Sequence, residues 1–283
     1  MAVESFSSVC KPVNASKVSV FFSRYPAAIS VSSREVENAL RRIGEQATEE
    51  GSRERRRARI RHINPYGDPF AVCHYVTEEM EHSAACREHD NLAKAICLDI
   101  DPSTFKPDNV RQGVLAGLLR RAIDMDPVQA PLMIEMLKNY LKTFDNCNDD
   151  FETMEEYMPY RIPNCGYCKA DYESIKEYDV AMGNVLGLTN DYFSWNVEKD
   201  QPTDRIRNGV RVLMREHGVP ATTAKAMLLG IIVEEECRAA RLKEQRLEKP
   251  VSKEILQYLD AIELYVGGSC YWHATAPRYQ IFE

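Results

Sequence analysis

The sequence predicts an all-α fold, a bundle of packed helices in a single domain over residues 1–283. Apolar residues recur three and four positions apart through several long segments, which is the spacing of amphipathic helices. Turn-forming residues separate these segments, as at Gly218–Pro220 and Lys249–Pro250. No competing β pattern and no internal repeat is present, so a one-domain α-bundle is the simplest architecture.

Two helices in the first half of the chain are expected to contribute apolar faces to the core. A third helix is expected from about residue 175 through residue 198, and amphipathic stretches cover residues 204–217, 222–246 and 252–273. The last of these has apolar residues in step along one face. The residues of the three faces are Val110, Val114, Leu118 and Ile123; Met133, Met136, Leu137, Tyr140, Leu141 and Phe144; and Ile255, Leu259, Ile262, Val266 and Cys270.

Charge and cysteine usage exclude several classes of partner. The net charge is −7 and the pI about 5.5, so there is no overall positive field to attract nucleic acid or an anionic membrane. The nine cysteines are scattered and odd in number, which favours a reducing compartment. Met1–Phe6 does not resemble a secretory signal, and the longest apolar run, Ala226–Val233, is too short to cross a bilayer. We therefore expect a cytoplasmic protein without membrane insertion, and its oligomeric state stays open.

The chemistry is concentrated in residues 190–198, within the helix expected from residue 175. At about 100° per residue, Asn190, Ser194 and Glu198 lie about 40° apart and share one face. Their amide, hydroxyl and carboxylate groups all present oxygen, the ligand that Mg²⁺ prefers alongside water and substrate phosphates. This spacing also occurs on many exposed helices, so alone it favours ordinary surface. The preceding apolar run 182–188 and the flanking aromatic residues indicate instead a polar patch at the mouth of a buried pocket.

Three segments, in this order along the chain, resemble class I terpene cyclases. Residues 156–166 resemble the segment with the diphosphate-sensing arginine, which would be Arg161. Residues 190–198 resemble the asparagine-serine-glutamate metal motif, and Pro277–Tyr279 resembles the family's arginine-tyrosine pair. The similarity is greatest to the cyclase domain of fungal bifunctional diterpene and sesterterpene synthases of the fusicoccadiene synthase type, and it extends from about Asn64 to Tyr279.

The resemblance implies a helical bundle around a central apolar cavity and Mg²⁺ as the cofactor. It implies ionisation and cyclisation of a linear isoprenoid diphosphate such as geranylgeranyl diphosphate, with release of diphosphate, and no C-terminal prenyltransferase domain. The implied metal ligands are Asn190, Ser194, Glu198 and Glu78. The implied catalytic residues are Arg161, Arg278 and Tyr279, and these three are also expected to bind substrate, together with Lys199, Phe193 and Trp272.

The chain departs from the family at its other metal motif. Where the family has an aspartate-rich helix, this sequence has His74–Glu78, and both leading aspartates are missing. The segments after Cys73 and after Gly166 are also shorter than in the family. The alternative is therefore a catalytically impaired or inactive cyclase-derived helical protein with only a partial metal and diphosphate site.

Two other candidate sites are weaker. Cys165 and Cys168 have zinc-knuckle spacing, but no second pair of ligands accompanies them. His273, next to Trp272, is expected to belong to a packed aromatic cluster rather than to act as a base.

Overall fold

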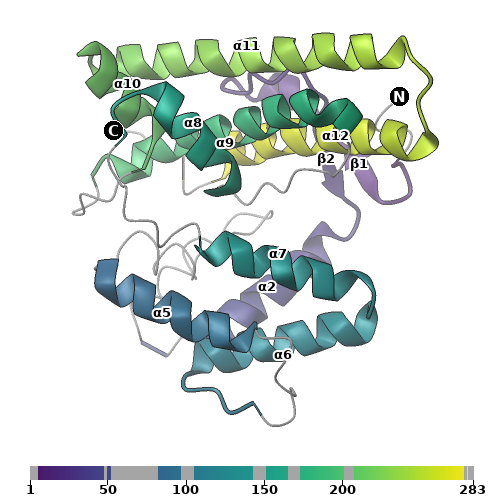
Figure 1. Cartoon of the computed structure of the whole chain (residues 1–283), viewed down its shortest axis with the longest axis vertical. Coiled ribbons are helices and arrows are strands. Elements are labelled where there is room, and N and C mark those ends of the chain that lie inside the picture. The colour runs from purple at the N-terminus through teal and green to yellow at the C-terminus, as the bar shows by residue number, and fades with distance from the viewer. Residues whose placement is uncertain are drawn as a thin grey trace. The chain divides into compact units, whose positions relative to one another are not determined.

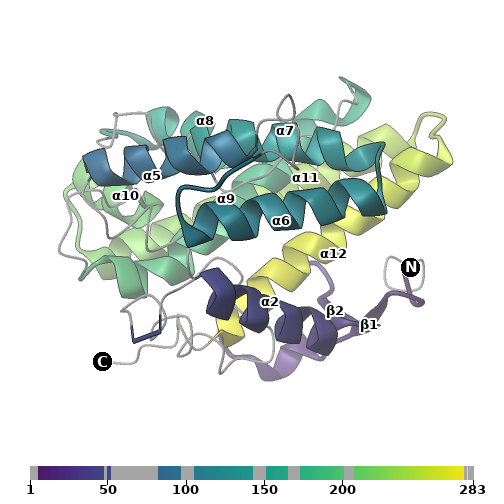
Figure 2. The same cartoon turned by 90° about the horizontal axis from the view of Figure 1, so that it is seen from below.

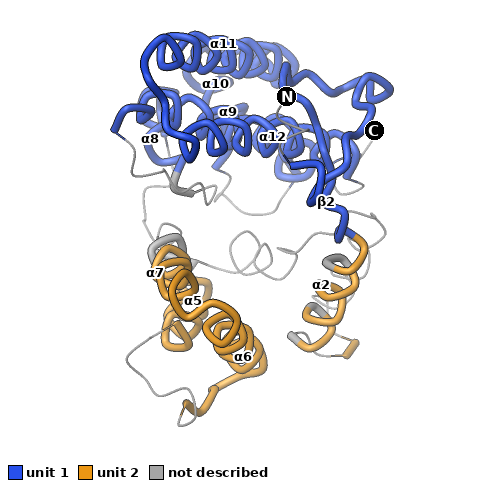
Figure 3. Tube along the Cα trace, turned by 90° about the vertical axis from the view of Figure 1, so that its right-hand side faces the viewer, with its two compact units in different colours: residues 1–33, 149–201, 206–283 blue, residues 34–148, 202–205 orange. Residues whose placement is uncertain are grey.

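The structure is a computed structural model, and it describes residues 6–47, 50–51, 82–96, 105–142, 151–164, 173–200, 207–276 and 279. Helices dominate these residues and confirm the all-α prediction. The strands they include form one small antiparallel sheet, in which β1 (Cys10–Pro12) pairs with β2 (Ala28–Ser30). Two compact units are formed, unit 1 from residues 1–33, 149–201 and 206–283, and unit 2 from residues 34–148 and 202–205 (Figure 3). The single domain over residues 1–283 stays a prediction.

Unit 1 is built around helix α9, Lys176–Glu198 (Figure 1). Helix α9 contacts every other α-helix of this unit, namely α8 (Met154–Asn164), α10 (Gly209–His217), α11 (Ala221–Leu247) and α12 (Lys253–Thr275). A short 3₁₀ turn, η3 (Glu173–Ile175), precedes it. Its run from residue 181 to residue 189 is buried at every position, as expected of a helix that is apolar all round and lies in the middle of a bundle.

The helices of unit 1 begin and end where the sequence carries capping residues. Asn208 and Ser252 accept backbone N–H groups at the starts of α10 and α12, and Gly218 ends α10 in the left-handed conformation, with φ of 63°. The predicted helices at 204–217, 222–246 and 252–273 are confirmed, although α10 begins at Gly209. The predicted face of α12 is confirmed as well, because Ile255, Leu259, Val266 and Cys270 are buried.

The N-terminal segment of unit 1 lies against α11 and α12. The Ser23 hydroxyl donates to Glu236 Oε1 at 2.6 Å, and the Arg24 amide donates to Glu236 Oε2 at 3.0 Å. On α12, a Cβ at Gly267 would collide with the carbonyl of Pro26. A glycine is therefore needed where the N-terminal backbone crosses the last helix.

Unit 2 contains α2 (Ser33–Ala47), α5 (His82–Ala95), α6 (Val110–Met125) and α7 (Gln129–Lys142). Helices α5, α6 and α7 contact one another, and Figure 2 shows them from below. Their apolar cluster has Ile96, Leu119 and Ile134 as its buried members.

The predicted core faces of α6 and α7 were partly wrong. Val110, Met133 and Met136 are exposed, whereas Ile123 and Leu137 do pack on the buried cluster. The buried face of α6 consists of Gln112, Ala116 and Leu119. The Gln112 side chain is buried because it hydrogen-bonds the backbone of Asn91 and Asp108, which apolar periodicity does not reveal. Phe144 and the side chains of Tyr140 and Leu141 lie outside the described residues.

Two further observations bear on the environment of the chain. In the part of the chain that the structure describes, no helix combines the length and apolarity needed to span a bilayer. The four cysteines within the described residues, Cys10, Cys86, Cys237 and Cys270, carry free thiols. Cys165 and Cys168 lie outside the described residues.

Candidate metal and diphosphate site

Asn190, Ser194 and Glu198 share one face of α9, and each presents an oxygen to a nitrogen donor. Arg161 Nη2 donates to Asn190 Oδ1 at 2.6 Å. Asn208 Nδ2 donates to Ser194 Oγ at 3.2 Å and to Glu198 Oε2 at 2.9 Å. Ser194 is buried and the other two are half-buried, so this face borders the interior of unit 1 and does not point into bulk solvent.

Arg161 of α8 joins this face through a buried ion pair. Its Nη2 lies 2.8 Å from Asp191 Oδ1, and the other carboxylate oxygen, Oδ2, accepts the Tyr157 hydroxyl at 2.7 Å and the Gly209 amide at 3.0 Å. Burial raises the pKa of Asp191, while Arg161 and the two other donors oppose that rise. Burial also raises the pKa of the Tyr157 hydroxyl, which remains protonated as a donor. The contacts of Asp191 thus fix the guanidinium beside Asn190.

On its other side, the Asn190 amide is oriented by α12. His273 Nδ1 lies 2.8 Å from the Ser269 carbonyl, which only accepts, so Nδ1 carries the proton. His273 Nε2, 3.0 Å from Asn190 Nδ2, is then an acceptor. The Tyr279 hydroxyl also accepts from Asn190 Nδ2, at 3.4 Å. These contacts turn Asn190 Oδ1 toward Arg161.

An aromatic cluster adjoins the polar face. The rings of His273 and Tyr279 stack with centroids 5.1 Å apart, and Trp272 meets Tyr279 edge-on at 5.6 Å. Phe193 stacks on Phe22 of the N-terminal segment at 5.7 Å. The structure therefore brings Phe193, Trp272 and Tyr279 together and confirms that His273 belongs to an aromatic cluster.

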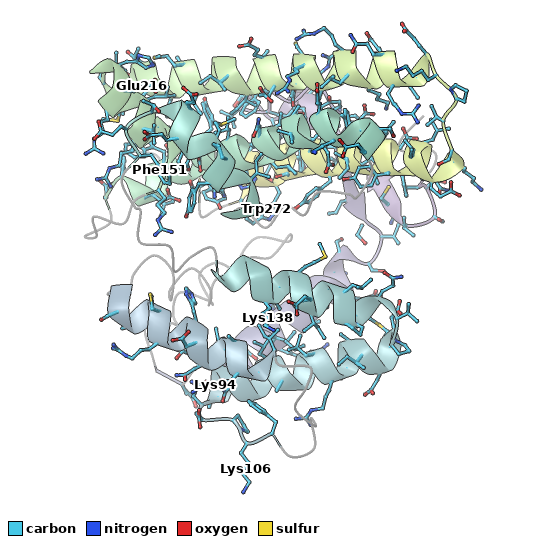
Figure 4. The ribbon with its side chains drawn as sticks, viewed as in Figure 1. Lys94, Lys106, Lys138, Phe151, Glu216 and Trp272 are labelled. Carbon is cyan, nitrogen blue, oxygen red and sulfur yellow. The ribbon has the colours of Figure 1, made fainter. Side chains whose placement is uncertain are left out.

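The end of unit 1 where α8 meets α10 holds Arg161 in place. Figure 4 labels Phe151 and Glu216 at this end and Trp272 on α12. Glu216 accepts the Met154 amide at the start of α8, at 2.9 Å. Phe151 packs on Tyr157 with ring centroids 5.2 Å apart. Both contacts hold the start of α8, and Arg161 reaches α9 from the last turn of the same helix.

Lys199, the predicted substrate contact after Glu198, lies near a second cation. Its charge contributes to the lowered pKa of Lys225, although burial of Lys225 is the larger cause. Lys225 donates to Asn196 Oδ1 at 3.1 Å and sits 4.4 Å above the Tyr192 ring. Nine residues after Asn190, Lys199 is turned about 180° away from it around the helix. Its substrate-binding role stays a prediction.

Two predicted site residues, Glu78 and Arg278, lie outside the described residues. Five of the others form two polar groups. Asn190 contacts both Arg161 and Tyr279, and Ser194 and Glu198 both accept from the Asn208 side-chain amide.

The donor set suits a hard divalent cation. The amide oxygen of Asn190, the hydroxyl of Ser194 and the carboxylate of Glu198 are ligand types that Mg²⁺ accepts. Each of these oxygens already accepts a hydrogen bond, from Arg161 or from Asn208. Across the ranges that the structure describes, no cluster of three or more histidine, cysteine, aspartate or glutamate side chains offers another metal site.

The sequence analysis missed three residues of this site, Tyr157, Asp191 and Asn208. Asn208 had a signal, because asparagine is a favoured N-cap residue and Asn208 lies near the start of the amphipathic stretch 204–217. Asp191 stands inside the motif but points toward Arg161 instead of sharing the face of the three predicted ligands. Tyr157 had no signal beyond lying on the helix of Arg161.

Comparison with known proteins links this geometry to one family. Residues 169–238, which include all of α9, match the family model described as terpene synthase family 2, C-terminal metal binding. The bifunctional sesterterpene synthase astC of Talaromyces wortmannii is 25% identical over an alignment 242 residues long, which covers 76% of this chain and 32% of that protein. The preasperterpenoid A synthase PvPS of Talaromyces verruculosus is 25% identical over an alignment 248 residues long, which covers 77% of this chain and 31% of that protein. The chain thus spans less than a third of the length of these curated relatives.

The fold is shared with solved terpene synthases. Aristolochene synthase from Penicillium roqueforti superimposes with a TM-score of 0.68 at 15% identity, over 94% of this chain and 100% of that one. The chain is therefore similar in sequence to fungal terpene synthases and shares the all-α fold of a solved terpene synthase, and its residues 169–238 match the model of the C-terminal metal-binding region of terpene synthase family 2.

Proposed function

We propose that the chain is a magnesium-dependent terpene cyclase that acts on a linear isoprenoid diphosphate. The observation that carries this proposal is the convergence of Arg161 and Tyr279 on Asn190, the first residue of the metal motif. An arginine fork and a hydroxyl beside three oxygen ligands suit a diphosphate with its metal.

In this proposal, Asn190, Ser194 and Glu198 hold Mg²⁺, with Glu78 as the further ligand that the sequence resemblance implies. The metal supplies positive charge that stabilises the departing diphosphate. Arg161, Arg278 and Tyr279 bind the diphosphate oxygens, and Asp191 keeps the Arg161 guanidinium in position.

The aromatic cluster would form the wall next to the metal. Ionisation of the substrate leaves an allylic cation, which aromatic faces stabilise and which water would destroy. Phe193 is buried and Trp272 half-buried on this side of α9. We propose that these two rings line the apolar cavity, and that the protein works in the cytoplasm.

The test is incubation of the protein with labelled farnesyl, geranylgeranyl and geranylfarnesyl diphosphates and Mg²⁺, followed by mass spectrometry of the hydrocarbons. We expect a cyclic product from at least one substrate. Glu198→Gln should lower the yield by at least about tenfold, because removing one ligand costs about 1.4 kcal/mol or more of metal binding. The matched control is Glu244→Gln on α11. Absence of product with all three substrates contradicts the proposal.

The second candidate is a cyclase-derived protein that no longer catalyses. It is favoured by His74–Glu78, where a single carboxylate replaces the family's aspartate-rich motif. Isothermal titration with pyrophosphate in the presence and absence of Mg²⁺ separates the two. Metal-dependent binding without any hydrocarbon product would identify a partial site, whereas product formation would exclude this candidate.

A further inference from the structure

Asn208, which precedes α10, is fully buried and faces the metal motif. Its Oδ1 accepts the Val210 amide at 2.8 Å and so caps α10. Its Nδ2 lies 2.9 Å from Glu198 Oε2, 3.2 Å from Ser194 Oγ and 3.0 Å from the Asp191 carbonyl. One amide nitrogen therefore stands between two of the three predicted metal ligands.

The neighbouring backbone allows this close approach. The Gly209 amide donates to Asp191 Oδ2 at 3.0 Å. A Cβ at Gly209 would lie 3.2 Å from that oxygen and 3.3 Å from Leu228 Cδ1, which is tighter than ordinary van der Waals contact. The start of α10 is thus seated directly on α9, and Asn208 has little freedom to move away.

An N–H donor and a cation use the same oxygen lone pairs. In the structure, the two hydrogens of Asn208 Nδ2 are divided among three acceptors, of which the Glu198 carboxylate gives the charge-assisted bond. A donor at this place keeps Ser194 and Glu198 turned toward each other without metal. A cation that binds these oxygens competes with the N–H groups for their lone pairs.

We propose that Asn208 is a positioning residue of the metal site: its side-chain amide holds Ser194 and Glu198 together before the metal binds and yields Glu198 to the metal. The proposal rests on the proposed function, because it assigns Ser194 and Glu198 to a cation. It also links metal binding to the start of α10, since the same side chain caps that helix.

The test replaces the amide by a carboxylate of the same shape. Asn208→Asp keeps an N-cap acceptor, removes the donor and sets a negative charge against Glu198. The matched control is Asn109→Asp, the same change at the N-cap of α6, where Asn109 Oδ1 accepts the Gln112 amide at 2.9 Å. Thermal unfolding of the whole chain is followed in EDTA and in increasing Mg²⁺ with inorganic pyrophosphate.

Without metal, we expect Asn208→Asp to lower Tm, because two carboxylates then face each other, and Asn109→Asp to leave it unchanged. With metal, the added ligand should lower the Mg²⁺ concentration that gives half-maximal stabilisation by about tenfold relative to wild type. If Asn208→Asp does not fold in EDTA, recovery of its circular dichroism spectrum on addition of Mg²⁺ and pyrophosphate is the expected result.

Other outcomes separate the two proposals. If Asn208→Asp behaves as Asn109→Asp in both conditions while wild type is stabilised by Mg²⁺ and pyrophosphate, the role of Asn208 is refuted and the proposed function stands. If wild type shows no stabilisation, the proposed function fails. In that case, if Mg²⁺ stabilises Asn208→Asp but not wild type, the placement of Asn208 beside Ser194 and Glu198 is still supported. If Mg²⁺ stabilises neither protein, that placement is overturned too.

Discussion

Units 1 and 2 are both helical, but they differ in what they bury. Unit 1 buries ionisable and polar side chains with their partners, and Asp191, Asn208 and Glu236 are each at most 2% exposed. The polar residues described as buried in unit 2 are His89 and Gln112, and its buried apolar cluster has three members. Burying a charge is costly unless it is paired and hydrogen-bonded. The polar interior of unit 1 therefore marks it as the unit organised around a site.

The two tryptophans of the chain allow the units to be observed separately. Trp195 and Trp272 both belong to unit 1, so tryptophan fluorescence reports unit 1, whereas far-UV circular dichroism reports the helices of both units.

The largest effect is expected at the buried ion pair of unit 1. Asp191→Ala removes the carboxylate that pairs with the Arg161 charge and accepts the Tyr157 hydroxyl and the Gly209 amide, which should cost about 3–5 kcal/mol of unfolding free energy. The matched change in unit 2 is Glu88→Ala, which breaks the 2.9 Å pair with Arg111. That pair is partly exposed, so we expect about 1 kcal/mol or less. Urea unfolding followed by both probes measures the two costs, and equal costs would remove the distinction between the units.

The next largest effect is expected from replacing a buried isoleucine by alanine in the core of each unit. Ile232 in unit 1 and Ile134 in unit 2 are both completely buried, so either change to alanine should cost about 2–5 kcal/mol. Ile232→Ala should shift the fluorescence transition. Ile134→Ala should shift an early part of the circular dichroism transition and leave fluorescence unchanged. Coincident shifts in both probes for Ile134→Ala would show that the units unfold together.

A smaller, pH-dependent effect is expected at Glu236. Burial raises its pKa, and the Ser23 hydroxyl and the Arg24 amide oppose that rise. The folded state thus favours the protonated carboxyl, so the stability that this group contributes is present below its ordinary pKa and is lost as pH rises through the raised value. As pH rises from 4.5 to 7, the Tm of wild type should fall relative to the Tm of Glu236→Gln. A difference in Tm that stays constant across this range would contradict the expectation.

The smallest effect is expected on the exposed face of α7. Met136→Gln should change the unfolding free energy by less than about 0.5 kcal/mol, because the Met136 side chain is exposed. Met182→Gln in the fully buried part of α9 is the contrasting variant and should cost several times more. A loss of more than about 1 kcal/mol for Met136→Gln would show that this methionine packs against something.

The sequence predicted unit 1 better than unit 2 for a physical reason. In α12, the predicted row of apolar residues is buried, so Leu259 and Val266 were correctly expected in the core, although Leu256 and Tyr265 of the same helix are exposed. In α6 and α7, apolar residues occupy more than one face, and periodicity cannot choose between them. There the choice depends on hydrogen bonds such as those of Gln112, which no apolar pattern contains.

For the site, motif spacing could predict which residues share a helix face. It could not predict which residues of other helices they hydrogen-bond. The three oxygens of α9 follow from the helix period alone. The contact of Asn190 with His273 joins residues 83 positions apart, and that of Arg161 with Asn190 joins residues 29 apart. The packing of α8 and α12 on α9 decides such pairs, so Asp191, Asn208 and His273 became visible as site components only in the fold.

The crossing of the N-terminal segment over α12 constrains how the chain is made. The bond from Ser23 to Glu236 spans 213 residues, so the segment that carries Ser23 can dock only after residue 236 has been synthesised. Residues 34–148 of unit 2 form one continuous stretch and meet no such delay. Closing so long a loop adds little thermodynamic cost, since each doubling of length costs about 0.6 kcal/mol, but it slows folding. Until α12 is in place, Phe22 and its apolar neighbours lack the surface that they pack against, and exposed apolar side chains of this kind make a partly folded chain prone to aggregation.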